Sequence, residues 1–350
     1  MRLKFTLGVL LMGCGCAHAA DTQNTRALFL KTIDRPRVLL APQVLPWAAA
    51  GGLEQTRFSY ASEVGQRVPG IMIRPKPKAG EERRKLPAVI ALHGTGDRKE
   101  GMAGLLREFA ARGFLGVAID GRYHGERARG AGGEDTYDQA ILRAFRQPGE
   151  HPFLYDTVWD VMRLIDWLET QPDVDASRIG LMGISKGGME TWLTAAVDPR
   201  VAVAVPCIGV QSFAWALEND QWQARAETIG EAVEAAAAES KVERIDAAFV
   251  RRFYDRVAPG IYSTFDGPAM LPLIAPRPLL VVNGDSDGLT PVPGVERAVA
   301  AARKAYGAAG ASERVKLILE EHAGHQITRE ALGEIEAWLV RWLGGHAQGS

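Results

Sequence analysis

The sequence predicts an α/β fold, in which helices cover both faces of a mostly parallel sheet. Short, continuous apolar runs, which are typical of strands buried on both faces, alternate with stretches of helical periodicity. Such alternation implies right-handed crossovers between parallel strands. The chain has 350 residues, 47% of them hydrophobic and 24% charged, which is an ordinary globular composition.

The expected elements form one domain over residues 57–345. A β-hairpin is predicted from the strands 57–64 and 68–74, with a polar loop after it. Buried strands are predicted at 87–92, 115–119, 178–184, 201–205, 278–282 and 315–319, and helices at 103–112, 154–169, 186–197 and 329–343.

The segment from 211 to about 270 interrupts this alternation. It holds no strand candidate, but it has an Ala/Glu-rich helical stretch at 232–239 and several aromatic residues, among them Trp215 and Trp222. A helical insertion between two strands is therefore expected. It could be an ordinary pair of surface helices, but insertions near the carboxyl ends of strands often cover ligands, which favours a cap.

The first 19 residues read as an export signal. Arg2 and Lys4 precede an apolar stretch at 5–12 that is too short to span a bilayer, and Ala17-His18-Ala19 fits a signal-peptidase cleavage site. The sequence therefore predicts a periplasmic or secreted protein.

A second interpretation of this signal is a bacterial lipobox, Leu11-Met12-Gly13-Cys14, in which Cys14 would carry a lipid anchor. With either interpretation of the signal, residues 20–56 are expected to form an N-terminal arm on the domain. The sequence suggests no function for this arm.

Composition argues against several classes of protein. The formal net charge of −1 and the absence of a basic run argue against nucleic-acid binding. No Cys/His spacing resembles a zinc site, and Cys207 is the one cysteine outside the signal, so no internal disulfide is expected. No other long apolar segment is present, so no membrane span is predicted, and neither metal nor organic cofactor is implied.

Gly183-Ile184-Ser185-Lys186-Gly187 is a G-x-S-x-G pentad between a predicted buried strand and a predicted helix. This setting is that of a nucleophile elbow, whose sharp turn strains the serine backbone and leaves no room for side chains at the flanking glycines. A glycine-rich turn with an incidental serine is the simpler interpretation, but the strand–turn–helix context favours Ser185 as a nucleophile.

A serine hydroxyl needs a base to take its proton, and histidine titrates in the right range. The candidates after Ser185 are His322, His325 and His346. His325 follows a glycine on a loop after the last predicted strand and just before the final helix, so it is preferred as the base. His322 could be a packing residue, and His346 lies in the C-terminal tail.

The histidine in turn needs an acid that fixes its tautomer. Asp285 and Asp287 both follow the predicted strand 278–282. Asp287 lies deeper in the loop and is the preferred acid, whereas Asp285 is expected to cap the turn. The order Ser185, Asp287, His325 is the one that α/β-hydrolases use.

Two backbone N–H groups are expected to stabilise a developing oxyanion. One is that of Lys186, at a helix N-terminus, and the other is assigned to Thr95 in the His93-Gly94-Thr95-Gly96 loop. His93 is expected to hold that loop by hydrogen bonds. The polar loop at 120–125 could bind substrate or pair internally, and turn chemistry slightly favours the structural role.

With these motifs in place, the chain resembles the dienelactone hydrolase, acetyl xylan esterase and prolyl-oligopeptidase-like branch of the α/β-hydrolase superfamily. The segments HGTG, AIDGRYHGE, GISKGG, NGDSDGLTP and AGHQIT carry the resemblance over about residues 60–343. It implies the same roles for Ser185, Asp287 and His325, with oxyanion donors at Thr95 and Lys186. Dienelactone hydrolases use cysteine, so serine here points to esters, and no segment is long enough for a propeller domain.

The expectation is therefore a serine-dependent carboxylic-ester hydrolase that forms an acyl-enzyme with small or sugar-linked esters. A serine peptidase or a thioesterase with the same triad remains an alternative, and a non-catalytic binding protein on the same fold is a third.

Overall fold

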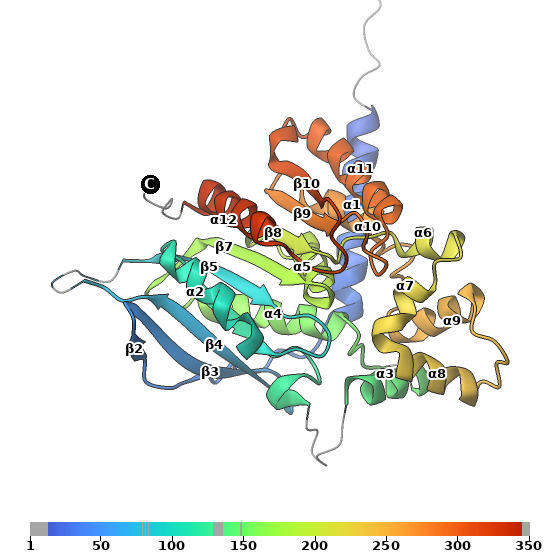
Figure 1. The fold of residues 1–350 in the computed structure, drawn as a ribbon, viewed down its shortest axis with the longest axis horizontal. Coiled ribbons are helices and arrows are strands. Elements are labelled where there is room, and N and C mark those ends of the chain that lie inside the picture. The colour runs from blue at the N-terminus through green and yellow to red at the C-terminus, as the bar shows by residue number, and fades with distance from the viewer. Residues whose placement is uncertain are drawn as a thin grey trace, which may run out of the picture.

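The computed structural model describes residues 13–344 except 79, 81, 83, 129–135 and 148, and it describes side chains from residue 23 onward. A mixed sheet of ten strands forms its centre (Figure 1). The strand order is β1-β3-β4-β6-β5-β7-β8-β9-β10, with β2 paired to β3. Strands β6 to β10 in this order are parallel, while β1 to β4 pair antiparallel at one side. The predicted α/β class is confirmed.

The strands are β1 Gln43–Val44, β2 Ala48–Ala50, β3 Leu53–Glu63, β4 Gln66–Pro75, β5 Leu86–Leu92, β6 Leu115–Ile119, β7 Val174–Ile184, β8 Val201–Cys207, β9 Leu279–Gly284 and β10 Val315–Glu320. The helices are α1 Gly13–Ile33, α2 Ala103–Ala111, α3 Tyr137–Arg146, α4 Tyr155–Leu168, α5 Lys186–Val197, α6 Phe213–Glu218, α7 Gln223–Ala226, α8 Gly230–Glu239, α9 Ala247–Val257, α10 Gly267–Met270, α11 Val292–Ala308 and α12 Arg329–Leu343.

Every strand and long helix predicted from periodicity is present, with ends shifted by a few residues. The predicted hairpin is the antiparallel pair β3–β4, and the predicted buried strands are β5 to β10. Outside the insertion, three described helices of ten or more residues, α1, α3 and α11, were not predicted. Helix α3 is nevertheless amphipathic, and it buries Tyr137, Ala140, Ile141 and Ala144 on one side.

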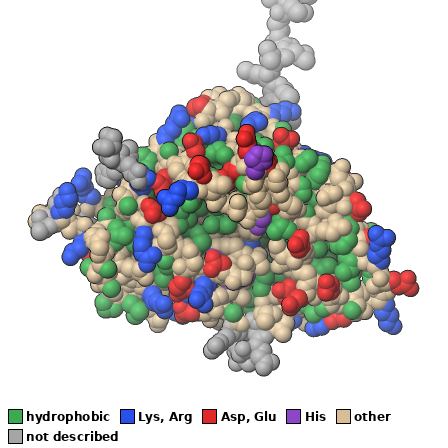
Figure 2. Space-filling view, viewed as in Figure 1, with side chains coloured by type: hydrophobic (Ala, Val, Ile, Leu, Met, Phe, Trp, Pro, Cys, Tyr) green, Lys and Arg blue, Asp and Glu red, His purple; other side chains and the backbone are tan. Residues whose placement is uncertain are grey.

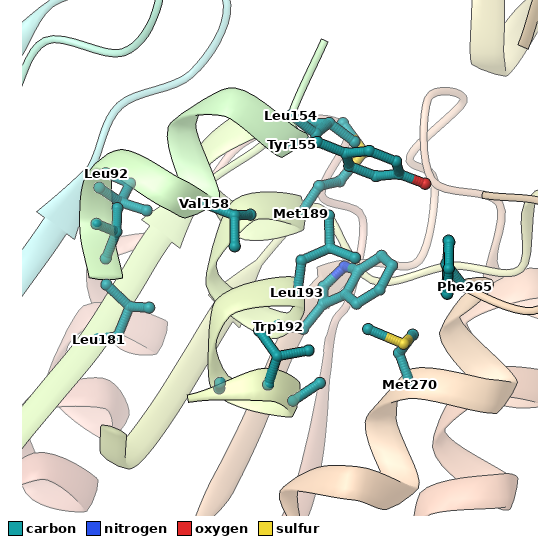
Figure 3. Packing of buried hydrophobic residues seen from close by; sticks show 14 of the residues in the cluster. Leu92, Leu154, Tyr155, Val158, Leu181, Met189, Trp192, Leu193, Phe265 and Met270 are labelled. Atoms are coloured by element: carbon teal, nitrogen blue, oxygen red, sulfur yellow. The ribbon is translucent and has the colours of Figure 1, made fainter. Parts of the chain in front are cut away.

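The core has two parts, one on each face of the sheet. Side chains of α2 and α12 cover one face, and those of α1, α4, α5 and α11 cover the other. On the second face, Met189, Trp192 and Leu193 of α5 pack beside Phe265 and Met270 (Figure 3). The Trp192 indole N–H donates to the Gly209 carbonyl at 3.1 Å, which satisfies its one polar atom.

Helix α1 packs into this second face. The Phe29 ring is fully buried and makes edge contacts with Tyr155 and Phe265, at centroid distances of 4.9 and 5.0 Å. The Arg26 guanidinium donates to the carbonyls of Ala196 and Leu273, each at 3.0 Å. The second half of α1 is therefore part of the folded body.

Most of the predicted signal, residues 1–19, lies outside the described residues. The side chain of Cys14, the alternative site of a lipid anchor, is also outside them. Residues 13–19 form the start of the α1 backbone, and α1 continues through position 20. Across the portion of the chain that is described, no helix is both long and apolar enough to cross a membrane.

The predicted helical insertion is present between β8 and β9. It contains α6 to α10 and no strand, and its helices α8 and α9 lie beside α3 at one end of the molecule (Figure 1). Asp266, at the start of α10, joins the insertion to its entry point, because its carboxylate accepts bonds from the Ser212 hydroxyl and the Phe213 N–H, both at 2.7 Å.

Candidate active site

Ser185 occupies a strained turn between β7 and α5. Its backbone has φ 56° and ψ −115°, in the region that L-residues rarely adopt. A Cβ on Gly183 would lie 2.2 Å from the Gly187 carbonyl oxygen, and a Cβ on Gly187 would lie 2.3 Å from that of Leu92. The predicted requirement for both glycines is confirmed: the first closes the turn, and the second brings the β5 loop against it.

His325 and Asp287 reach Ser185 from the loops after β10 and β9. The Ser185 hydroxyl lies 2.7 Å from the His325 Nε2 atom, and the His325 Nδ1 atom lies 2.8 Å from an Asp287 carboxylate oxygen. Nδ1 therefore carries the proton donated to the carboxylate, and Nε2 is free to accept the serine proton. The structure brings together the three residues that the sequence singled out.

The Asp287 carboxylate is fully buried, and its environment keeps it charged. Burial would raise its pKa, but the hydrogen bond from His325, together with those from Thr290 and the Leu289 N–H, outweighs burial and lowers the pKa below its ordinary value. A carboxylate that remains ionised can orient the imidazole and stabilise its protonated form.

The rival residues lie elsewhere. The Asp285 carboxylate accepts a bond from the adjacent Ser286 hydroxyl at 2.8 Å, so it caps the turn as predicted. His322 is exposed and has a positive φ of 59°. His346 lies outside the described residues.

The oxyanion donors are expected from Lys186, which follows Ser185, and from Thr95 in the loop after β5. Lys186 is the first residue of α5, where backbone N–H groups lack intrahelical partners and the helix dipole favours negative charge. Thr95 lies in the loop after β5, next to Gly94, and a Cβ on Gly94 would lie 3.5 Å from that of Ser185. The loop that carries Thr95 therefore runs alongside the serine.

His93 fixes this loop. Its Nδ1–H donates to the Gly94 carbonyl at 2.8 Å, and its Nε2 accepts the Gly121 N–H at 3.0 Å. Burial, assisted by the charge of Lys186, lowers the pKa of His93 to about 3, so the ring is neutral. The structural role predicted for His93 is confirmed.

The loop after β6 is held by internal pairing, which was the favoured interpretation. The Arg122 guanidinium binds the Asp160 carboxylate through two bonds of 2.8 and 2.9 Å, and the Lys99 ammonium binds Asp120 at 2.8 Å and Glu126 at 2.6 Å. All of these groups except Glu126 are buried.

A buried ion pair behind the nucleophile was not predicted. The Lys186 ammonium lies 2.8 Å from a Glu190 carboxylate oxygen, and each side chain is 1% exposed. The two residues are one helical turn apart, and that spacing was the available signal. The side chain of Lys186 is thus held by an ion pair within α5 and does not face solvent.

Charges of both signs are interspersed over the face drawn in Figure 2, with no large field of one sign. Within the described ranges, no group of three or more His, Cys, Asp or Glu side chains is placed to hold a metal ion.

The chain belongs to the α/β-hydrolase superfamily. In this fold a nucleophile follows a central parallel strand, and an acid and a histidine come from loops after later strands, in that chain order. Here β7, β9 and β10 lead to Ser185, Asp287 and His325.

Comparison with known proteins narrows the class. Residues 50–220 match the acetyl xylan esterase (AXE1) family model, and residues 141–310 match the model of the fungal glucuronyl esterases. A protein of Bacillus subtilis (strain 168), YtaP, is 25% identical over 79% of this chain and 84% of its own length. The 4-O-methyl-glucuronoyl methylesterase 1 of Sodiomyces alcalophilus is 31% identical over 44% of this chain and 30% of its own.

Among solved structures, methylesterase BT1017 superposes with a TM-score of 0.70 at 16% identity, over 97% of this chain and 67% of that chain. An acetyl xylan esterase from Paenibacillus sp. R4 gives a TM-score of 0.63 at 20% identity, over 92% and 93%. At these identities the structures support the fold. The two family matches make the chain an ester-bond hydrolase.

Proposed function

We propose that this protein is a serine esterase that removes acyl groups from sugar-linked esters, with Ser185 as nucleophile, His325 as general base and Asp287 as its orienting acid. The observation that carries the proposal is the chain of two hydrogen bonds, of 2.7 and 2.8 Å, from the serine hydroxyl through the imidazole to the buried carboxylate.

The reaction follows from this geometry. The Ser185 oxygen attacks the ester carbonyl carbon while its proton moves to the His325 Nε2 atom. The tetrahedral intermediate collapses, the C–O bond to the alcohol breaks, and the imidazolium gives its proton to the departing oxygen. Water, deprotonated by the same imidazole, then hydrolyses the acyl-enzyme.

The negative oxygen of each tetrahedral intermediate would be stabilised by the backbone N–H groups of Lys186 and Thr95. Lys186 follows Ser185 directly, and the contacts of Gly94 and Gly187 hold the loop that carries Thr95 close to the serine turn. Preorganised donors of this kind typically contribute on the order of a hundredfold or more in rate each.

The sugar-linked substrate class is supported by the two matched esterase families and by the relatives named above. Export to the periplasm or outside the cell is part of the same proposal, and it is supported by the positive, apolar and small-residue pattern of residues 1–19.

The test compares wild type with Ser185→Ala on acetylated sugars, p-nitrophenyl acetate, aminoacyl anilides and acyl thioesters. Ester turnover should fall by a factor on the order of 10⁴ or more in the variant. A fluorophosphonate should label wild type at Ser185 and leave Ser185→Ala unlabelled. Turnover of anilides or thioesters without ester turnover would instead identify a peptidase or a thioesterase, and a failure to label wild type would indicate a binding protein.

A further inference from the structure

The two loops beside the predicted active site are tied together by one imidazole. His93 donates its Nδ1–H to the Gly94 carbonyl at 2.8 Å, and its Nε2 atom accepts the Gly121 N–H at 3.0 Å. Gly94 precedes Thr95, the expected oxyanion donor, and a Cβ on Gly94 would lie 3.5 Å from that of Ser185. The position of the Thr95 N–H therefore depends on this imidazole bridge.

The bridge requires one protonation state of the His93 ring. Only the neutral imidazole with its proton on Nδ1 can donate to Gly94 and accept from Gly121 at the same time. A proton on Nε2, in the other tautomer or in the imidazolium, would set two N–H donors against each other at Gly121. A group that selects the Nδ1–H state of His93 therefore also holds the loop of Thr95.

The Lys186 ammonium lies on the Nε2 side of this ring. A Cβ built on Gly121 would lie 2.9 Å from the Lys186 Nζ atom and 3.5 Å from the His93 Nε2 atom, so both nitrogens lie against the same glycine. A cation at this place favours a lone pair on Nε2 over an N–H, and it opposes protonation of the ring. Burial lowers the pKa of His93 to about 3, and the charge of Lys186 is the next largest cause.

Glu190 holds the ammonium in this place. Its carboxylate lies 2.8 Å from the Lys186 Nζ atom, one helical turn along α5, and both side chains are 1% exposed. A hydrogen bond with Thr157 anchors the carboxylate in turn. The ammonium also lies over the Tyr137 ring, with Nζ 5.8 Å from the ring centroid. These contacts keep the charge against Gly121.

Other titratable groups near His93 affect it less. The charges of Lys99 and Arg127 lower its pKa by smaller amounts than that of Lys186, and both cations are bound by carboxylates of the loop after β6 and of α4. The His124 ring lies 5.0 Å from that of His93, and burial lowers its pKa to about 2, so it is neutral. Lys186 is thus the cation with the largest effect on His93.

We propose that the side chain of Lys186 is a positioning residue of the oxyanion hole. Its ammonium, fixed by Glu190, holds His93 in the neutral Nδ1–H form that ties the loop of Thr95 to the loop after β6. The inference rests on the proposed esterase function, because it concerns the oxyanion donors of that reaction. Lys186 then serves the reaction twice, through its backbone N–H and through the side chain behind the loop.

The test replaces the ion pair by a neutral pair of similar size, Lys186→Met with Glu190→Gln. Met keeps the aliphatic stem, and Gln can keep the hydrogen bond with Thr157, so the variant has neither an unpaired buried charge nor a large cavity. For p-nitrophenyl acetate, kcat should fall at least about tenfold while KM stays within about threefold, because a displaced donor weakens transition-state binding only. An unchanged kcat would overturn the inference.

A second set of variants shows whether Lys186 acts through His93. His93→Asn removes the acceptor of the Gly121 N–H and should itself lower kcat. In the His93→Asn background, the neutral pair should lower kcat by less than about twofold more, because the group on which the ammonium acts is gone. Losses that multiply when the substitutions are combined would overturn this route.

The ion pair Arg112–Glu336 supplies the matched control. It lies on the opposite face of the sheet, with side chains 14% and 11% exposed. Arg112→Met with Glu336→Gln removes the same two charges and should leave kcat within about twofold of wild type. An equal loss of kcat in both paired variants would indicate a general effect of lost ion pairs and would overturn the assignment.

The protonation state of His93 can be measured without turnover. In ¹⁵N NMR of histidine-labelled wild type at pH 6, His93 should show a protonated Nδ1 and an unprotonated Nε2, and His93→Asn assigns its signals. In Lys186→Met with Glu190→Gln, the Nε2 signal should move towards the protonated form, and the pKa of His93 should rise, since a nearby cation is gone. A wild-type ring with its proton on Nε2, or an unchanged signal in the variant, would overturn the inference.

The two proposals can fail separately. Ester activity that survives Ser185→Ala would refute the serine mechanism, and the NMR signals of His93 would still decide what Lys186 does to the ring. Full activity of the neutral-pair variant, with turnover that still requires Ser185, would overturn the positioning role and leave the esterase intact.

Discussion

Acidification is expected to destabilise this protein through two histidines that are buried in the neutral form beside the nucleophile. His93 is 2% exposed and His124 is 4% exposed, and their rings lie 5.0 Å apart. Protonation would remove the His93 Nε2 acceptor from the Gly121 N–H. At His124 it would create a second N–H where the Nε2 atom is buried without a partner, since its Nδ1–H already donates to the Arg122 carbonyl.

The size of the effect follows from the pKa values. Burial lowers the pKa of His93 from 6.5 to about 3 and that of His124 from 6.5 to about 2, in each case with a smaller contribution from the charge of Lys186. Below pH 6.5 the unfolded chain binds protons that the folded chain does not, so the stability falls as the pH falls. From pH 8 to pH 5 each histidine costs about 2 kcal/mol, and the pair costs about 4 kcal/mol, a large part of a typical folding free energy.

The variant His124→Phe isolates the contribution of His124 to the pH dependence of stability. It loses the hydrogen bond to the Arg122 carbonyl at every pH, which shifts the whole curve, and it loses the titration of His124, which changes the slope. Urea unfolding at pH 5, 6, 7 and 8 should show that the free energy of unfolding falls by about 2 kcal/mol less in His124→Phe than in wild type over this range. The exposed His322→Asn is the control and should follow wild type. Parallel curves for His124→Phe and wild type would refute the reasoning.

Two further predictions concern the acid and the N-terminus. Asp287→Asn should lower kcat for ester hydrolysis by a factor on the order of 10³–10⁴, because an amide favours the wrong imidazole tautomer. Asp285→Asn, at an exposed position two residues earlier, should change kcat less than about threefold in the same assay, and equal losses would contradict the assignment of the acid. For export, intact-mass measurement of the protein from the periplasm or medium of a bacterial host should give a chain that begins at Ala20. A diacylglyceryl adduct on Cys14 would establish the lipoprotein alternative, and an uncleaved chain in the cytoplasm would contradict export.

The position of Ser185 could be predicted because the constraint on it is local. A buried strand, a glycine-flanked turn and a helix follow one another within a short stretch, and the glycine contacts at 183 and 187 are the physical reason for the motif. His325 and Asp287 could be predicted because parallel strands bring their carboxyl ends to one edge of the sheet. Asp287 is buried and Asp285 is exposed, which agrees with the choice of Asp287 as the acid. Burial of this kind cannot be read directly from the sequence.

Other features depend on packing between distant segments and could not be predicted. Arg225 belongs to a short, polar helix whose pattern resembles an exposed surface, yet insertion residues and the Phe213 ring enclose it. The pair Lys186–Glu190 has the spacing of an ordinary surface ion pair, and only the position of α5 beneath the loop after β6 buries it. The 17-residue α11 is rich in alanine and has a glycine near each end, and alanine is common on both buried and exposed helix faces, so its composition does not mark the helix clearly.

The order in which helix α1 acquires its contacts affects how the chain matures. The two carbonyls that Arg26 binds lie 170 and 247 residues further along, and the aromatic partners of Phe29 lie similarly far ahead. During synthesis this part of α1 therefore emerges long before these partners exist and cannot complete its packing until most of the chain has been made. For a chain that is exported unfolded, this delay would postpone completion of the core until after transport, when the same segment docks.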